Sequence, residues 1–339
     1  MASPPPLSPD RPDVSPDPVL DQPGRRPARL ARVTDVSLWA EWAAPVGLVI
    51  LAVVFQLMNS TFLSLGNVKA MLVAAAILVV LSVGQTFAVA TGGIDLSVAS
   101  TMTFGAIVFG LAYAKGAPLP VCCLLALAAG LLVGLVQGLV VGRGRITDFI
   151  VTLGGLSVAS GLALVVSDGK PTTVISPFLL RLSTQGVGPV GYTVILALAV
   201  ALLAHVLLFH TRFGTHVLAA GGSPEAATAT GISLANIKTA VYAISGLLSG
   251  LAAILLVARV GASEPAANMQ FLLNSVAAVV LGGVSLMGGR ATIAGPVAGA
   301  LLLTGLTNGL TLLGVSQYYQ PVAVGAVVVL AAFLTRFQR

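Results

Sequence analysis

Long apolar runs, separated by short breaks rich in glycine and polar residues, fill most of the chain beyond residue 42. A bilayer crossing needs about 20 such residues, and it forms a helix because lipid offers no partner for backbone N–H and C=O groups. The eighth run is the weakest, because it is short and interrupted by glycine. The pattern predicts ten transmembrane helices, at residues 43–58, 68–90, 96–113, 119–141, 149–167, 192–209, 237–257, 271–282, 293–313 and 322–334.

Composition excludes a water-soluble globule. Apolar residues make up 57% of the chain and charged residues only 8%, whereas soluble domains carry about 25% charged residues. Nine of the 19 prolines lie in the first 36 residues, a stretch too polar to bury a core. We therefore predict an all-α polytopic membrane protein, with a disordered cytoplasmic tail rich in Pro, Asp and Arg at 1–36 and a transmembrane domain at 37–339.

The distribution of Lys and Arg predicts the orientation of the helices. Cytoplasmic loops are enriched in these residues. With the N-terminus inside, ten crossings place twelve Lys and Arg residues in the cytoplasm and five outside. An odd number of helices would leave Arg336 and Arg339 on the opposite side. Both termini are therefore expected to be cytoplasmic.

A polar segment between the second and third apolar runs reads Thr-Gly-Gly-Ile-Asp-Leu-Ser at residues 91–97. Gly92 and Gly93 end one helix, and Asp95 stands where the N-cap of the next would accept backbone N–H groups. Two roles remain open and can coexist: Asp95 only caps the helix, or this glycine-opened backbone also lines or gates a transport path. The other candidates for such a path are Ser97, Asn274 and Asn308.

A second polar segment, within a loop at about 219–235, predicts a short helix on the cytoplasmic face. Ser223 can cap it, Pro224 can occupy its first position, Glu225 suits its positive end and Gly231 can end it. Such a helix can simply lie at the membrane interface without a partner. It also reads literally Glu-Ala-Ala-x-x-x-Gly from Glu225 to Gly231.

The sequence contains no catalytic motif. It lacks a phosphate-binding loop and a nucleophile elbow, and its three histidines have no zinc-ligand spacing. We therefore predict no enzyme activity, no catalytic residue, no metal and no cofactor. His205, within the sixth apolar run, is either a proton relay or a neutral histidine bonded to a neighbouring helix. Together with Asp95 it leaves an ion-coupled secondary transporter or a passive channel as the alternative function.

Several motifs resemble one family across residues 60–335. The segment at 91–97, Phe-Ile-Val-Thr-Leu-Gly at 149–154, Gly-Gly-x-Ser-Leu-x-Gly-Gly-Arg at 282–290 and Leu-Gly-Val-Ser-x-x-x-Gln at 313–320 occur in order. They resemble the permease subunits of ATP-binding-cassette importers, specifically the ribose, xylose and related monosaccharide branch. Asp148 departs from the pattern, which has a proline or a small residue there.

The resemblance implies a function and a set of partners. It implies the permease subunit of an importer in the bacterial inner membrane that translocates a monosaccharide or related small polyol. The implied partners are a separate ABC ATPase, a periplasmic or lipid-anchored sugar-binding protein, membrane lipid and a second copy of the chain, but no nucleic acid. It assigns docking on the ATPase to a coupling helix, with the residues Glu225, Ala226, Ala227, Gly231 and Ile232, although the usual downstream Leu-Pro is absent.

Overall fold

The computed structural model describes residues 36–188, 190–266 and 269–336. The contacts of the chain separate Met1–Val36 from Ser37–Arg339, and the fold described below is that of the second unit. The predicted disordered tail, apart from its last residue, lies outside the described residues. So does Arg339.

Helices dominate the described residues, which confirms the all-α class. Each of the ten predicted apolar runs coincides with a helix, although several helices extend beyond the predicted bounds. These helices are α2 (Val36–Met58), α3 (Leu65–Ala90), α4 (Val98–Ala114), α5 (Leu119–Gly144), α6 (Asp148–Ser167), α8 (Tyr192–Phe209), α11 (Leu234–Val260), α12 (Met269–Leu281), α13 (Ala294–Leu312) and α14 (Gln320–Arg336).

Six of these helices are long and apolar enough to cross a membrane, namely α3, α5, α6, α8, α11 and α13. The other four contain apolar helical stretches of only 10–17 residues within the part of the chain that the structure describes. The 13 residues of α12 rise about 20 Å, whereas the hydrocarbon core is about 30 Å thick. Ten crossings and the orientation of the termini therefore remain predictions.

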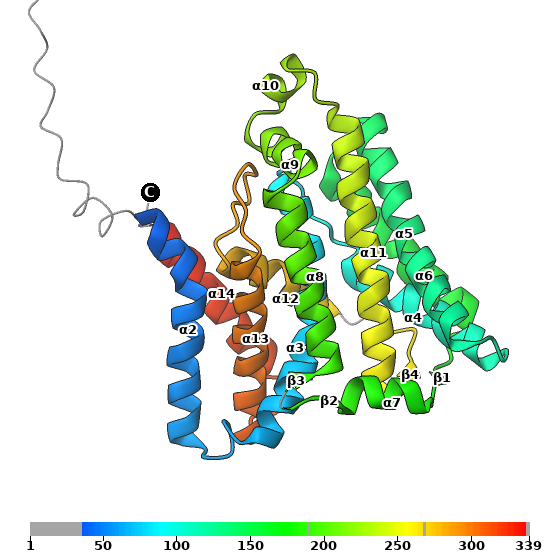
Figure 1. Cartoon of the computed structure of the whole chain (residues 1–339), viewed down its shortest axis with the longest axis vertical. Coiled ribbons are helices and arrows are strands. Elements are labelled where there is room, and N and C mark those ends of the chain that lie inside the picture. The colour runs from blue at the N-terminus through cyan, green and yellow to red at the C-terminus, as the bar shows by residue number, and fades with distance from the viewer. Residues whose placement is uncertain (1–35, 189, 267–268, 337–339) are drawn as a thin grey trace, which may run out of the picture. The chain divides into compact units, whose positions relative to one another are not determined.

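Short helices and strands lie at two opposite ends of the bundle (Figure 1). One end carries α9 (Arg212–Gly222) and α10 (Pro224–Ala229). The other carries α7 (Pro177–Thr184) and two antiparallel pairs of very short strands, β1 (Thr172–Thr173) with β4 (Ala262–Ser263) and β2 (Gly186–Val187) with β3 (Val190–Gly191). We call these the α10 end and the α7 end.

The centre of the bundle is formed by α3 and α11. Every residue of α3 from Ala75 to Ala90 is buried. Glycines allow α5 and α11 to approach to backbone contact, since a Cβ added at Gly134 would lie 3.0 Å from Cα of Gly246 and against the carbonyl of Tyr242. Small residues at such spacing permit close helix packing in lipid. The position of α11 is thus fixed by α5.

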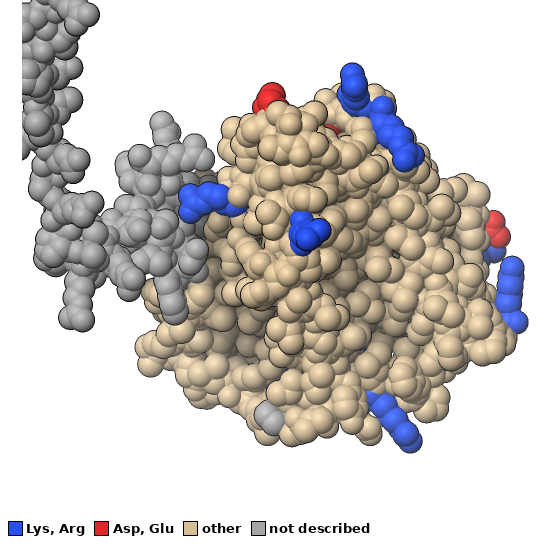
Figure 2. Space-filling model, turned by 45° about the horizontal axis from the view of Figure 1, so that its top comes forward, with Lys and Arg blue, Asp and Glu red and all other residues tan. Residues whose placement is uncertain are grey.

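The outer helices present apolar side chains to their surroundings. Leu132 on α5, Val158 on α6 and Leu202 on α8 are each more than 60% exposed. Charged side chains are sparse on the face drawn in Figure 2. Exposed leucine and valine in these numbers fit a lipid environment, because soluble proteins keep such patches small.

Candidate functional site

The short helix predicted near residue 225 is present as α10. Ser223 is its N-cap and accepts a hydrogen bond from the N–H of Ala226 at 3.3 Å, and Pro224 occupies the first helical position. Gly231 has φ +85°, a conformation that glycine adopts without strain. The N–H of Ile232 then donates to the carbonyl of Ala227 at 3.0 Å, which closes the helix end.

The two faces of α10 differ in exposure. Glu225, Ala226 and Gly231 are exposed and Ile232 is half-buried, but Ala227 is only 3% exposed. Ala227 therefore packs against the rest of the protein and does not belong to the exposed surface of α10; its role in docking stays a prediction. The exposed face of α10 offers one carboxylate beside small side chains.

Backbone atoms from three segments that are distant in sequence are in contact at the end of α9. The N–H of Gly289 donates to the carbonyl of Ala90, the last residue of α3, at 3.0 Å. A Cβ added at Gly288 would lie 2.7 Å from the nitrogen of Gly92 and 2.8 Å from the oxygen of Gly221. The end of α9, the α12–α13 loop and the end of α3 are thus in direct contact, and side chains there would separate them.

The turn between α3 and α4, residues 91–97, buries a carboxylate. Asp95 is 2% exposed. Its Oδ1 accepts hydrogen bonds from the N–H and hydroxyl of Ser97 at 2.9 and 2.7 Å, and its Oδ2 accepts one from the hydroxyl of Ser245 at 2.7 Å. Burial raises the pKa of Asp95 above its usual value, although the hydrogen bonds from Ser245 and Ser97 oppose that shift.

The sequence predicts Asp95 as the N-cap of α4, but this prediction is wrong. The helix begins at Val98 and Ser97 is its N-cap. The reason is that Asp95 bonds the N–H of Ser97 and holds the preceding residues in a turn of their own. The carboxylate thus satisfies donors just before the helix, and through Ser245 it also connects the turn to α11.

Two buried glutamines complete this polar network. The side chain of Gln137, on α5, donates to the hydroxyl of Ser97 at 2.9 Å. The amide of Gln85, on α3, faces the backbone of Asp95, and in its favourable orientation it donates to the carbonyl at 3.1 Å and accepts from the N–H at 3.2 Å. Sequence analysis does not single out either glutamine, although each is a polar residue within an apolar run.

A second polar cluster lies next to the same turn. Lys238 on α11 donates to both carboxylate oxygens of Asp148, the first residue of α6, at 3.0 and 2.9 Å. It also donates to the carbonyl of Thr91 at 3.2 Å. The hydroxyl of Tyr242 donates to Asp148 at 2.7 Å. Asp148, which departs from the family pattern, therefore forms an ion pair that sequence analysis does not predict.

The remaining candidates are separate from this region. Asn308 exchanges two amide hydrogen bonds with Asn67 at 3.0 and 2.8 Å, and Asn274 accepts one from Gln270 at 2.9 Å. Among the described residues, neither asparagine forms a hydrogen bond with Asp95. His205 is exposed on α8, where its ring lies 4.9 Å from that of Phe209. The prediction of a histidine bonded to a neighbouring helix is therefore wrong.

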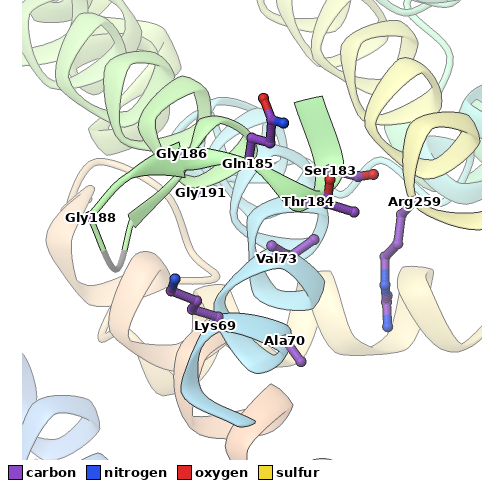
Figure 3. A pocket seen from close by; sticks show the side chains of 10 residues that line it. All are labelled: Lys69, Ala70, Val73, Ser183, Thr184, Gln185, Gly186, Gly188, Gly191 and Arg259. Atoms are coloured by element: carbon purple, nitrogen blue, oxygen red, sulfur yellow. The ribbon is translucent and has the colours of Figure 1, made fainter. Parts of the chain in front are cut away.

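A cavity of about 380 Å³ opens at the α7 end of the bundle (Figure 3). Two cationic side chains line it: Lys69, on α3, extends toward Gly188 in the β2–β3 hairpin, and Arg259 extends from the end of α11, well apart from Lys69 in the view. Among the described residues, no group of three His, Cys, Asp or Glu side chains is placed to hold a metal ion.

Comparison with known proteins identifies similar chains. Residues 67–332 match the family described as the permease component of branched-chain amino acid transport systems. The chain is 36% identical over 296 residues to the ribose import permease protein RbsC of Bacillus subtilis (strain 168), covering 86% of this chain and 91% of the relative. It is 32% identical over 278 residues to the L-arabinose ABC transporter permease protein AraH of Azospirillum brasilense, covering 82% of each. No solved structure matches the chain.

Proposed function

This chain belongs to the family of permease components of branched-chain amino acid transport systems, and we propose that it forms the transmembrane passage for a monosaccharide or a related small polyol in an ATP-driven importer. It is a transport subunit of the bacterial cell membrane and not an enzyme, and ATP hydrolysis comes from a separate ATPase chain. The similarity to ribose and L-arabinose permeases over more than four fifths of the chain supports the substrate class.

The family match over residues 67–332 is the single observation on which the proposal rests. It favours ATP-driven import over an ion-coupled carrier or a channel. Two details argue in the same direction. Asp95 already accepts three hydrogen bonds from serines, and His205 is exposed on the outer face of α8, so the two residues do not form a shared ion path.

The same proposal assigns roles to the α10 end of the bundle. This end faces the cytoplasm, both termini lie there, and ten helices cross the membrane. The exposed residues Glu225, Ala226 and Gly231 of the coupling loop dock on the ATPase, while Ala227 and Ile232 hold α10 in place. The exposure of the first three residues and the burial of Ala227 support this division.

The passage lies in a homodimer that receives sugar from an extracytoplasmic binding protein. We assign its gate to the turn at residues 91–97, with Gly92, Gly93, Asp95 and Ser97. The turn contacts the α12–α13 loop through Gly92, and α9 contacts Ala90 immediately before the turn, which supports the assignment. It means that movement of the coupling loop has a direct route to the gate.

Reconstitution tests the proposal. Proteoliposomes containing the permease, with ATPase and ATP on the cytoplasmic side and sugar-loaded binding protein on the other, should accumulate labelled sugar. Replacing ATP by a proton or sodium gradient should abolish accumulation. Uptake driven by the gradient without ATPase would instead identify an ion-coupled carrier, and equilibration without either energy source would identify a channel.

A further inference from the structure

The helix α11 follows the coupling loop almost immediately and carries two polar side chains near its start. It begins at Leu234, and its N-cap Ser233 accepts a hydrogen bond from the N–H of Asn236 at 3.4 Å. Lys238 and Tyr242 are four residues apart and therefore lie on one face of the helix. A displacement of α10 thus reaches Lys238 after about one turn of α11 and Tyr242 after about two turns.

Lys238 and Tyr242 join three helices at one point. Lys238 is within 3.2 Å of the carbonyl of Thr91 and within 3.0 Å of both oxygens of Asp148, and Tyr242 bonds the same carboxylate at 2.7 Å. We call these four residues the Lys238 cluster. It connects the start of α11 to the start of α6 and to the end of α3.

Gly93 brings the turn at residues 91–97 directly against the cluster. A Cβ added to Gly93 would lie 2.7 Å from the hydroxyl oxygen of Tyr242 and 2.9 Å from Oδ1 of Asp148. The turn therefore has no free space on this side. On another side, Ala90 and Gly92 touch the α12–α13 loop and α9. The segments on both sides of α10 thus contact the region where α3 ends.

The ion pair between Lys238 and Asp148 is not explained well by a contribution to folding stability alone. The side chains of Lys238 and Asp148 are 20% and 19% exposed, and theirs is the one ion pair between residues that the structure describes. A partly buried pair pays for desolvation, and apolar side chains of similar size commonly replace such pairs without loss of stability. The charges instead connect separate elements, because the ammonium group of Lys238 bonds both the carbonyl at the end of α3 and the carboxylate at the start of α6.

We propose that the Lys238 cluster transmits the movement of the coupling loop to the turn at residues 91–97, and that it is dispensable for ATPase docking. This inference rests on the proposed function. Docking would displace α10 and the start of α11 together. Lys238 and Tyr242 would then pull Thr91 and Asp148, and the turn that buries Asp95 would follow.

The test uses a variant that leaves no unpaired charge. Asp148→Asn combined with Lys238→Met removes the ion pair and keeps side chains of similar size. Lys238→Arg keeps the charge and the donors, and Arg143→Met removes an exposed cation from the end of α5 as a matched control. Each variant is reconstituted with the ATPase and sugar-loaded binding protein, and three quantities are measured: bound ATPase, ATP hydrolysed and sugar imported.

The double variant should bind the ATPase and hydrolyse ATP as the unmodified protein does, but import about tenfold less sugar per ATP, within the usual range of coupling between sites. Lys238→Arg and Arg143→Met should import normally. Normal import per ATP by the double variant would overturn the inference, as would loss of ATPase binding. If the unmodified protein itself imports no sugar with ATP, the proposed function fails instead.

A milder variant covers the case in which the double variant does not fold. Tyr242→Phe removes one hydroxyl and one hydrogen bond to Asp148 without leaving a charge unpaired. Sugar imported per ATP should fall about threefold, as expected for one hydrogen bond of ordinary strength. An unchanged ratio in this folded variant would also overturn the inference.

Discussion

Two substitutions of Asp95 distinguish the contribution of its hydrogen bonds from that of its charge, because Ala removes both and Asn removes only the charge. Asp95→Ala removes three bonds, two from Ser97 and one from Ser245. The backbone N–H of Ser97 then has no partner, which costs about 1–3 kcal/mol, and the two hydroxyl bonds add about 1 kcal/mol each. The expected loss is about 3–5 kcal/mol, a large part of a net folding stability of about 5–15 kcal/mol.

Asp95→Asn should be tolerated much better. Its amide oxygen keeps the two bonds from Ser97, and the hydroxyl of Ser245 can turn to accept from the amide nitrogen. The loss should stay near 1 kcal/mol, because only the added strength of bonds to a charged acceptor is removed. Ser100→Ala serves as a control, since it removes one local bond from a buried serine of α4.

Thermal unfolding of the detergent-solubilised proteins, followed by size-exclusion chromatography, gives the comparison. Asp95→Ala should lose its folded peak at a clearly lower temperature than Asp95→Asn, and Asp95→Asn should behave like Ser100→Ala. Equal thermal stability of the Ala and Asn variants would refute the assignment of Asp95 to a set of required hydrogen bonds. A folded Asp95→Asn variant without ATP-driven uptake would show that the charge itself serves the passage.

Three further predictions concern packing, docking and the tail. Gly134→Leu should destabilise the protein by about 3 kcal/mol or more through overpacking of α5 on α11. Gly154→Leu on α6 should not, because a Cβ there meets nothing within 4 Å. Equal melting temperatures of the two variants would contradict this prediction. Ala226→Trp should abolish ATPase pull-down without lowering the melting temperature, while Ala227→Trp should lower it, because only Ala227 is buried; normal pull-down with Ala226→Trp would remove α10 from the docking surface. Deletion of residues 2–32 should leave ATP-driven uptake nearly unchanged in correctly inserted protein, and its loss would refute a dispensable tail.

Local chemistry explains what the sequence predicted correctly. The apolar runs predicted the helices because lipid imposes a helix on any long apolar segment. The short helix α10 was predictable because Ser223, Pro224 and Gly231 act within a few residues of one another. Its orientation was not, since neighbouring alanines carry no polarity that tells a buried face from an exposed one.

Contacts between distant residues explain what the sequence missed. Asp148 and Lys238 are 90 residues apart, and nothing in either local sequence indicates the other as a partner. The same holds for Asp95 and Ser245, whose bond helps to set the turn before α4. Predicting Asp95 as an N-cap considered only its neighbours in sequence, whereas the structure shows that α11 also determines its position.

The central claim is that this chain moves sugar only as part of an ATP-driven assembly. The most direct measurement counts ATP hydrolysed and labelled sugar imported in the same vesicles, with the permease, the ATPase and the sugar-loaded binding protein added singly and together. Import should appear only when all three are present and should rise in proportion to the ATP hydrolysed. Import that continues without the ATPase, or at the same rate when ATP hydrolysis is blocked, would contradict this claim.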